Sequence, residues 1–188
     1  FADKYQYNSG SNIQTGATVN DPVLRTLQAR LDDRVSIRSF GASGDNTDQT
    51  AALQRAVDQL YLNASNKGTP QARVELILEP GEYKTTSTIY LPPYATIRGA
   101  GSDKTIINAG NHVAFQTVNE TSTPGSYASD AISTSTNQAR HISMSGLSIK
   151  NDNIGIMLQS CRDSKFEDIT ISGTWALGDT ASNTNVGI

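Results

Sequence analysis

Apolar residues in the last third of the chain recur at a spacing of 22 positions. The segment 142–149 is a pair of short alternating strands around Gly146, and the segment 164–171 repeats its pattern. Three apolar pairs define the register: Met144 with Phe166, Leu147 with Ile169, and Ile149 with Ile171. An internal repeat takes precedence over the assignment of single elements when a fold is inferred.

A period near 22 with three short strands per unit is typical of a coil of a parallel β-helix, in which inward side chains stack from coil to coil. Ile154-Gly155-Ile156 matches Val186-Gly187-Ile188, and the second unit has a longer loop over residues 173–185. A single coil cannot bury its own inner face, so we expect further coils beyond residue 188. A β-sandwich would instead need hairpin-connected strands, and the glycine-split pairs fit it poorly.

The first 34 residues differ from the rest. Residues 1–20 are polar and predict an extended arm without order of its own. Asp21 and Pro22 suit the start of a short helix that runs to Leu31. Its apolar stripe would either dock on the following domain or meet copies of itself about a three-fold axis: Val23, Leu24, Leu27 and Leu31.

Upstream of the repeat the pattern predicts one helix and several strands. Residues 35–40 alternate as a strand, and residues 49–62 form a helix capped by Thr47 or Asp48. The apolar face of this helix is Ala52, Leu53, Ala56, Val57 and Leu60. Further strands are expected at 74–78, 85–89, 96–99 and 105–107. Residues 119–138 predict a long surface loop.

Residues 35–60, VSIRSFGASGDNTDQTAALQRAVDQL, resemble the opening segment of the pectate-lyase-like superfamily. That segment is a strand, a turn of the type DFGA-x-GDG-x-TDDT and a capping helix. Here Ser39, Asn46 and Gln49 replace the usual Asp, Gly and second Asp. Residues 76–83 are similar to the family's PPG-x-Y strand and turn, and residues 97–101 to its I-x-G-x-G strand.

The resemblance implies an all-β, right-handed parallel β-helix over residues 35–188, preceded by the arm and helix of residues 1–34. Fold does not fix chemistry, and the family includes polysaccharide lyases, glycosidases and phage tailspikes. The short helix running directly into Val35 resembles phage virion proteins in which an N-terminal arm attaches the spike. Because the chain starts Phe1-Ala2-Asp3 and stops inside a repeat, we expect it to be part of a longer polypeptide.

The amino-acid composition argues against two classes of binding partner. Hydrophobic residues make up 36% of the 188 residues and charged residues 18%, with a net charge of −3. Without a basic surplus we expect neither nucleic acid nor an anionic membrane surface as a partner. No apolar run approaches the roughly 20 residues that span a bilayer. The single Cys161 precludes an intrachain disulfide.

Carboxylates are the first candidates for chemistry. Asp45 and Asp48 could form the acid pair of a glycosidase, but at a turn and helix start they more simply satisfy free amides. Asp163, Glu167 and Asp168 lie in the repeat, where Asp168 should face outward beside inward-pointing Ile169. We expect these three carboxylates either to lie on a solvated surface of the coil or to form a sugar-binding site.

Calcium-assisted lyase action would need clustered carboxylates and a basic residue on neighbouring coils. Lys150, Arg162 and Lys165 are near in sequence, but no alignment across coils stands out. We therefore leave the catalytic residues unassigned and expect them outside this segment, with no cofactor and no metal.

The remaining candidates have simpler interpretations. His112 and His141 lack metal-ligand spacing, and His141 is expected at a corner before a strand. Trp175 could stack on a sugar, cover a loop or contact a neighbouring subunit. Cys161 fits a small buried apolar residue better than a nucleophile. Gly99-Ala100-Gly101 is too short for a nucleotide fingerprint.

Two hypotheses follow. In the first, the chain is a homotrimeric phage tail fibre or tailspike protein of the virion. Its arm contacts other tail or baseplate proteins, and its β-helix serves recognition of host surface polysaccharide. In the second, it is a polysaccharide lyase or glycoside hydrolase, either a tailspike depolymerase or a free extracellular enzyme.

Overall fold

A computed structural model describes residues 4–6, 24–26, 31, 34–63, 65, 74–128 and 137–173. It divides into two compact units, Phe1–Val35 and Ser36–Ile188, which we treat separately. Within these residues we find no helix with the length and apolar character that crossing a membrane requires.

In the first unit two short strands pair antiparallel, β1 (Lys4–Gln6) and β2 (Leu24–Thr26). The arm predicted over residues 1–20 therefore contains a strand, and β2 supplies its partner. The prediction of a helix from Asp21 to Leu31 is wrong for residues Leu24–Thr26, which form strand β2. Pairing with β1 gives these residues backbone partners, whereas so short a helix gains little because its first turn is costly to nucleate. Of the predicted apolar stripe, Val23 and Leu27 lie outside the described residues and Leu31 is exposed, so the role of the stripe stays a prediction.

The strand predicted over residues 35–40 is only half correct. β3 (Arg34–Ser36) ends early and continues as a 3-10 turn, η1 (Ile37–Phe40). Ser36 causes the change, because its Oγ accepts a hydrogen bond from the backbone N of Arg38 at 3.1 Å. The turn buries Ile37 and leads into β4 (Asp45–Asp48).

The predicted helix forms as α2 (Thr50–Val57) and continues as a wider π-helical turn, η2 (Asp58–Leu62). Its predicted apolar face is confirmed, since Ala52, Leu53, Ala56 and Val57 are buried and Leu60 packs partly against the core. The predicted cap at Thr47 or Asp48 is wrong, because Gln49 holds the N-cap position without a side-chain capping bond, but Asp48 still binds the backbone amide of the first helical residue. Asp48 Oδ1 accepts a hydrogen bond from the backbone N of Thr50 at 3.0 Å.

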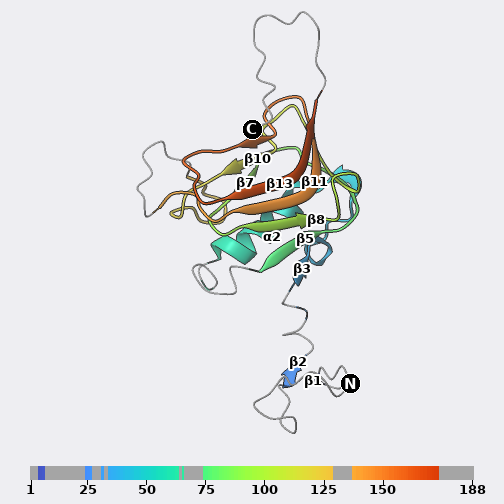
Figure 1. The fold of residues 1–188 in the computed structure, drawn as a ribbon, viewed down its shortest axis with the longest axis vertical. Coiled ribbons are helices and arrows are strands. Elements are labelled where there is room, and N and C mark those ends of the chain that lie inside the picture. Colours follow the sequence, from blue (N-terminus) through green and yellow to red (C-terminus); the bar gives the residue numbers. More distant parts are fainter. Residues whose placement is uncertain are drawn as a thin grey trace, which may run out of the picture. The chain divides into compact units, whose positions relative to one another are not determined.

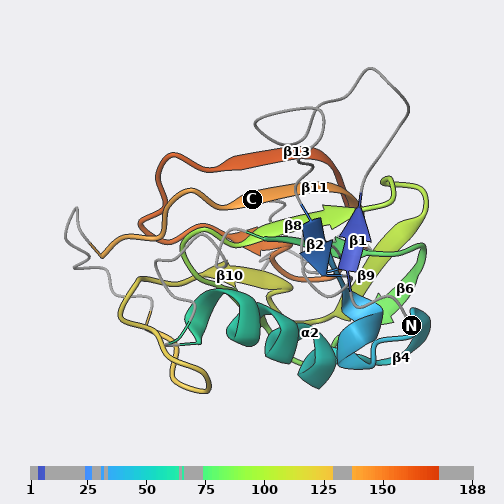
Figure 2. The ribbon, with the colours of Figure 1, turned by 90° about the horizontal axis from the view of Figure 1, so that it is seen from below.

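Helix α2 closes one edge of the strands that follow (Figure 2). Strand β7 (Ile89–Leu91) is the edge strand of its sheet. The side-chain Oε1 of Gln54 accepts a hydrogen bond from the backbone N of Tyr90 at 2.8 Å, and its Nε2 donates to the carbonyl of Tyr90 at 3.4 Å. A side chain of the helix thus takes the place of a further strand beside β7.

The strands follow one another in coils (Figure 1). The first coil holds β5 (Glu75–Leu78), β6 (Gly81–Lys84) and β7, and the second holds β8 (Thr96–Gly99), β9 (Thr105–Gly110) and β10 (Phe115–Thr117). The third holds β11 (Ser143–Asn151) and β12 (Ile156–Met157), and β13 (Lys165–Ser172) begins the fourth. Successive coils pair in parallel.

The coils build three faces. The first face consists of β5, β8 and the first halves of β11 and β13, and the second of β4, β6, β9 and the second halves of β11 and β13. The third face consists of β7, β10 and β12. The chain is thus an all-β parallel β-helix, right-handed as parallel crossovers are. The parallel pairing excludes the β-sandwich, whose sheets are antiparallel.

The register predicted from the 22-residue repeat is confirmed in β11 and β13. Met144 pairs with Phe166, Leu147 with Ile169, and Ile149 with Ile171. The predicted match between residues 154–156 and 186–188 is not tested, because residues 186–188 lie outside the described residues.

Inward side chains of successive coils form apolar ladders, one under each face. The buried ladders are Leu76-Ile97-Met144 on the first face, Tyr83-Ile107-Ile149 on the second and Ile89-Phe115-Ile156 on the third. Burying a side chain of this size contributes about 1.5–3 kcal/mol. Stacked hydrophobic burial therefore supplies the core that a single coil lacks.

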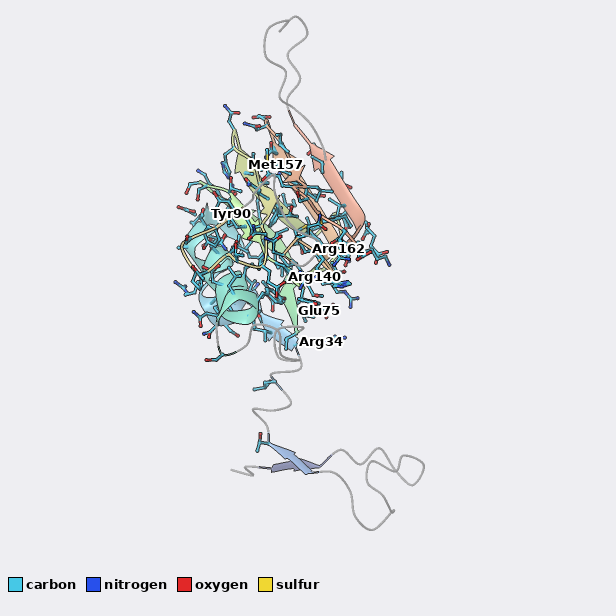
Figure 3. All side chains as sticks on the ribbon, turned by 90° about the vertical axis from the view of Figure 1, so that its left-hand side faces the viewer. Arg34, Glu75, Tyr90, Arg140, Met157 and Arg162 are labelled. Carbon is cyan, nitrogen blue, oxygen red and sulfur yellow. The ribbon has the colours of Figure 1, made fainter. Side chains whose placement is uncertain are left out.

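The loop predicted over residues 119–138 is described in part, at residues 119–128 and 137–138, and it folds back on the third face. Tyr127 stacks on Tyr90 with ring centroids 4.3 Å apart, and its hydroxyl donates to Asp58 Oδ2 at 2.8 Å. Burial and then the hydrogen bond to Asp58 raise the pKa of Tyr127 to about 12, so the phenol stays a donor at neutral pH. Figure 3 shows Tyr90 and Met157 on the opposite side from Glu75, Arg140 and Arg162.

The stacked ladders predict that two leucines of the third coil differ sharply in their contribution to stability. Leu147 is 0% exposed and Leu158 is 41% exposed. Leu147→Ala should lower the free energy of unfolding by about 2–5 kcal/mol, because it leaves a cavity. Leu158→Ala should change it by less than about 0.5 kcal/mol. Urea denaturation followed by circular dichroism measures both, and equal losses would contradict the assignment of the core.

Candidate functional site

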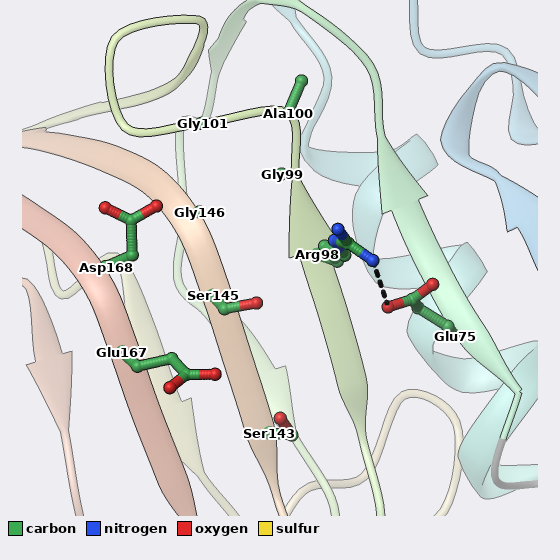
Figure 4. Close-up of a pocket in the computed structure, with 10 residues that line it drawn as sticks. All are labelled: Glu75, Arg98, Gly99, Ala100, Gly101, Ser143, Ser145, Gly146, Glu167 and Asp168. Carbon is green, nitrogen blue, oxygen red and sulfur yellow. Dashed lines mark ion pairs between the residues drawn. The ribbon is translucent and has the colours of Figure 1, made fainter.

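A groove of about 510 Å³ lies on the outer side of the first face (Figure 4). Four neighbouring strands contribute to it, since Glu75 comes from β5, Arg98 from β8, Ser145 from β11 and Glu167 from β13. The outward positions Arg98, Ser145 and Glu167 are in register across three of these strands. Neighbouring strands are about 4.8 Å apart, so the groove crosses the coils and presents side chains from each of the four strands.

Backbone forms the middle of the groove where the first face bends into the second. A Cβ atom added at Gly99 would lie 2.2 Å from the carbonyl oxygen of Gly146, so no side chain fits there. The backbone N of Gly101 donates to the same oxygen at 2.8 Å. Gly146 has φ +68°, a conformation that glycine adopts without steric cost. A ligand in the groove can therefore approach the backbone closely.

Two outward carboxylates follow each other at the bend of β13. Asp168 has φ +50°, which interrupts the usual alternation of side chains along a strand. Both Glu167 and Asp168 consequently line the groove, as Figure 4 shows. The prediction that Asp168 faces outward is confirmed, because its side chain is exposed.

Most charges of the groove have partners. Glu75 lies 3.7 Å from Arg98, and Glu167 lies 2.7 Å from Lys165. Lys165 and Glu167 are more than half exposed, so their pair contributes little to stability. In the described part of the chain, the side chain of Asp168 has neither a hydrogen bond nor an ion pair to another residue.

The groove changes the interpretation of the acidic and basic candidates. Glu167 and Asp168 lie in it, whereas Asp163 pairs with Arg162 at 3.0 Å outside it. Lys150 pairs with Glu82 at 3.5 Å and lines a second hollow of about 340 Å³ on the second face.

Sequence reasoning missed Glu75, Arg98 and Ser145. These residues could have been found only from the register between β8 and β11. The loop inserted between the two strands separates the paired residues Ile97 and Met144 by 47 positions, so no repeat was visible in the sequence.

Asp45 and Asp48 are structural, as the sequence favoured. Asp45 Oδ1 accepts hydrogen bonds from Thr47 Oγ1 at 2.6 Å and Thr47 N at 3.1 Å. Asp48 Oδ1 accepts from Thr50 Oγ1 at 2.6 Å, and its Oδ2 accepts from Thr86 Oγ1 at 3.0 Å. These bonds, chiefly those from Thr47 and Thr50, lower the pKa of both carboxyl groups. An acid held ionised in this way is a poor proton donor.

The two histidines lie away from the groove. His141 has φ +53° and stacks on Tyr94 at a corner before β11, as predicted for its position. His112 Nε2 lies 3.2 Å from Thr85 Oγ1, and burial lowers the pKa of its imidazole. Trp175 lies outside the described residues. Among the described residues, no group of three or more His, Cys, Asp or Glu side chains could hold a metal ion.

Cys161 is half-buried and packs partly against the core. Burial raises the pKa of its thiol, although a hydrogen bond to Ser164 at 3.2 Å acts in the opposite direction. The thiolate is the nucleophilic form, so these surroundings favour the structural interpretation.

Comparison with known proteins adds three findings. The family model described as "Rhamnogalacturonase A/epimerase, pectate lyase-like" matches residues 34–188. A glucan 1,3-beta-glucosidase of Cochliobolus carbonum is 40% identical in a 77-residue alignment that covers 36% of this chain and 9% of that protein. The solved structure of ORF18 of Geobacillus virus E2 is similar with a TM-score of 0.55 and 25% identity, over 76% of this chain and 26% of that one. The chain thus spans a small part of either relative.

Proposed function

We propose that this chain, which belongs to the rhamnogalacturonase A/epimerase, pectate lyase-like family, is part of a phage tail fibre or tailspike that binds polysaccharide on the host surface. The groove of the first face carries this proposal. It is open, crosses four strands, and offers carboxylates, a guanidinium and hydroxyl groups to a sugar chain. The likeness to ORF18 of Geobacillus virus E2 supports the viral assignment.

The N-terminal region has a separate role in this proposal. Residues 1–34 attach the protein to other tail or baseplate proteins of the virion, and residues 35–188 form the start of the β-helical shaft. The separation of Phe1–Val35 from the rest of the chain as a compact unit supports the division. A short strand pair such as β1 and β2 is marginally stable alone, which suits a segment that is held by a partner.

The protein is expected to be a homotrimer, as an attachment arm beside a β-helical shaft suggests. Multi-angle light scattering on the purified protein should give three times the mass of one chain. A monomeric mass across the micromolar range would reject the trimer without affecting the groove.

Filling the groove should abolish glycan binding. Ser145 points into the groove from β11, and Ser145→Trp places a large ring there without touching the buried ladders. We expect a loss of at least about tenfold in affinity for host surface polysaccharide, because the sugar chain cannot enter. Isothermal titration calorimetry with the purified polysaccharide measures it.

Thr170→Trp is the matched control. Thr170 is an exposed residue of β13 that pairs with Ser148 on the second face, outside the groove. Its substitution should leave the affinity unchanged. Equal affinities of the protein and Ser145→Trp would place the glycan site elsewhere.

The second candidate function is cleavage of the polysaccharide, and one observation favours it. Glu167 and Asp168 line one groove together with a basic residue, Arg98. Glu75 does not suit a pair with Glu167, because the backbones of β5 and β13 are about 14 Å apart and glycosidase carboxyl groups are roughly 5–9.5 Å apart. Glu167 and Asp168 are the pair within reach of one sugar bond.

An enzyme of this kind should release reducing ends or unsaturated uronides from the bound polysaccharide. Glu167→Gln should then lower the rate about 100-fold or more, as loss of general acid–base catalysis does, while binding persists. A reducing-sugar assay beside the ultraviolet absorbance of unsaturated uronides checks both chemistries. Binding without release of either product would leave the attachment role and remove the enzymatic one.

A further inference from the structure

We propose that Asp168 sets the charge selectivity of the groove, so that it takes neutral or amine-bearing polysaccharides and excludes those made of acidic sugars. This inference rests on the glycan-binding function proposed above. It concerns the class of polysaccharide, which the fold leaves open.

The position of Asp168 in the coil is the first step. Arg98, Ser145 and Glu167 are in register, and the residue after each stands at the bend of its coil. In the two coils before β13 this residue is a glycine, Gly99 or Gly146, and the two glycines are in contact through their backbones. One coil further the corresponding residue is Asp168, between Glu167 and Ile169, which pair with Ser145 and Leu147. Of these three residues at the bend, only Asp168 has a side chain, and Figure 4 shows its carboxylate beside Gly146.

The backbone at this bend restricts what can stand there. Asp168 has φ +50°, a left-handed conformation that favours glycine and, among residues with a side chain, asparagine and aspartate. A charged group at the bend is thus one of a few choices that the coil permits. Its carboxylate has no partner among the residues that the structure describes.

The charges around Asp168 leave it as the main electrostatic feature of the groove. Three carboxylates and one guanidinium line the groove. Arg98 is 3.7 Å from Glu75, and the nearby Lys165 is 2.7 Å from Glu167. Each of these cations is therefore already engaged by a carboxylate, and an acidic sugar would meet Asp168 without a free cation to offset the repulsion.

The physical consequence depends on the charge of the ligand. Hydroxyl groups of a neutral sugar donate hydrogen bonds to a carboxylate, and an ammonium group adds charge assistance. A uronate brings a like charge, and at about 4 Å in a solvated groove this lowers affinity about fivefold. The selectivity should weaken with salt, because exposed charges are screened.

Calorimetric titration of the protein with three soluble polymers tests this inference at low ionic strength. The polymers are a neutral β-glucan, a chitosan oligosaccharide and polygalacturonate. We expect the first two to bind and polygalacturonate to bind more weakly than either. Asp168→Asn, which suits the left-handed backbone, should weaken chitosan binding about fivefold, strengthen polygalacturonate binding about fivefold, and change β-glucan binding less than about twofold.

Two further variants make the test decisive. Asp168→Gly restores the glycine column and should reproduce the effects of Asp168→Asn on both charged polymers. Asp163→Asn is the matched control, because Asp163 is also exposed with φ +48° but lies outside the groove. It should change none of the three affinities.

The outcomes separate this inference from the function on which it rests. If polygalacturonate binds the protein as tightly as the other polymers, or if Asp163→Asn shifts affinities as much as Asp168→Asn, the selectivity is refuted and glycan binding stands. If none of the three polymers nor the host polysaccharide binds, the proposed function itself fails, and the selectivity fails with it.

Discussion

Each coil of this protein depends on its neighbours for backbone hydrogen bonds and for burial of its inner side chains. Ile97 and Met144 have a coil on either side and are almost fully buried, whereas Phe166, whose strand pairs with β11, is only partly buried. The same dependence explains α2. The first coil has no earlier coil beside β7, and Gln54 of α2 supplies hydrogen bonds to Tyr90 in its place.

Stacking constrains the inner side of a coil and leaves the outer side free. Inward positions are buried and mostly apolar, because they pack directly on the coils before and after. The outward column of Arg98, Ser145 and Glu167 contributes no such packing, and its residues differ in size and charge. The groove is therefore a product of the coil geometry, while its chemistry is set by residues that the fold does not require.

The same distinction explains how far the sequence could be interpreted. The register of Met144 with Phe166 was readable because no insertion separates the two coils. The pairing of Met144 with Ile97 was hidden by the loop between β10 and β11, so the groove could not be assembled from sequence. The start of the helix predicted from Asp21 was wrong, because the pairing of Leu24–Thr26 with a strand some 20 residues away has no local signature, although Leu31 at its predicted end is helical. That Asp45 and Asp48 satisfy backbone amides was predictable, since each accepts from an amide only two residues further along the chain.

The bend between the first and second faces is the one outward site where fold and chemistry constrain each other. Its left-handed backbone admits glycine, asparagine or aspartate with little strain. The groove can therefore carry one of three groups at this point: a bare backbone, an amide side chain or a negative charge. Gly146 and Asp168 occupy this bend in successive coils. Replacing Asp168 by glycine or asparagine would change the charge of the groove with little backbone strain, whereas a Cβ at Gly146 would lie 3.0 Å from the carbonyl oxygen of Gly99. Under the proposed function, the residue at this bend would therefore set the charge of the sugars that the groove accepts without altering the stacked core.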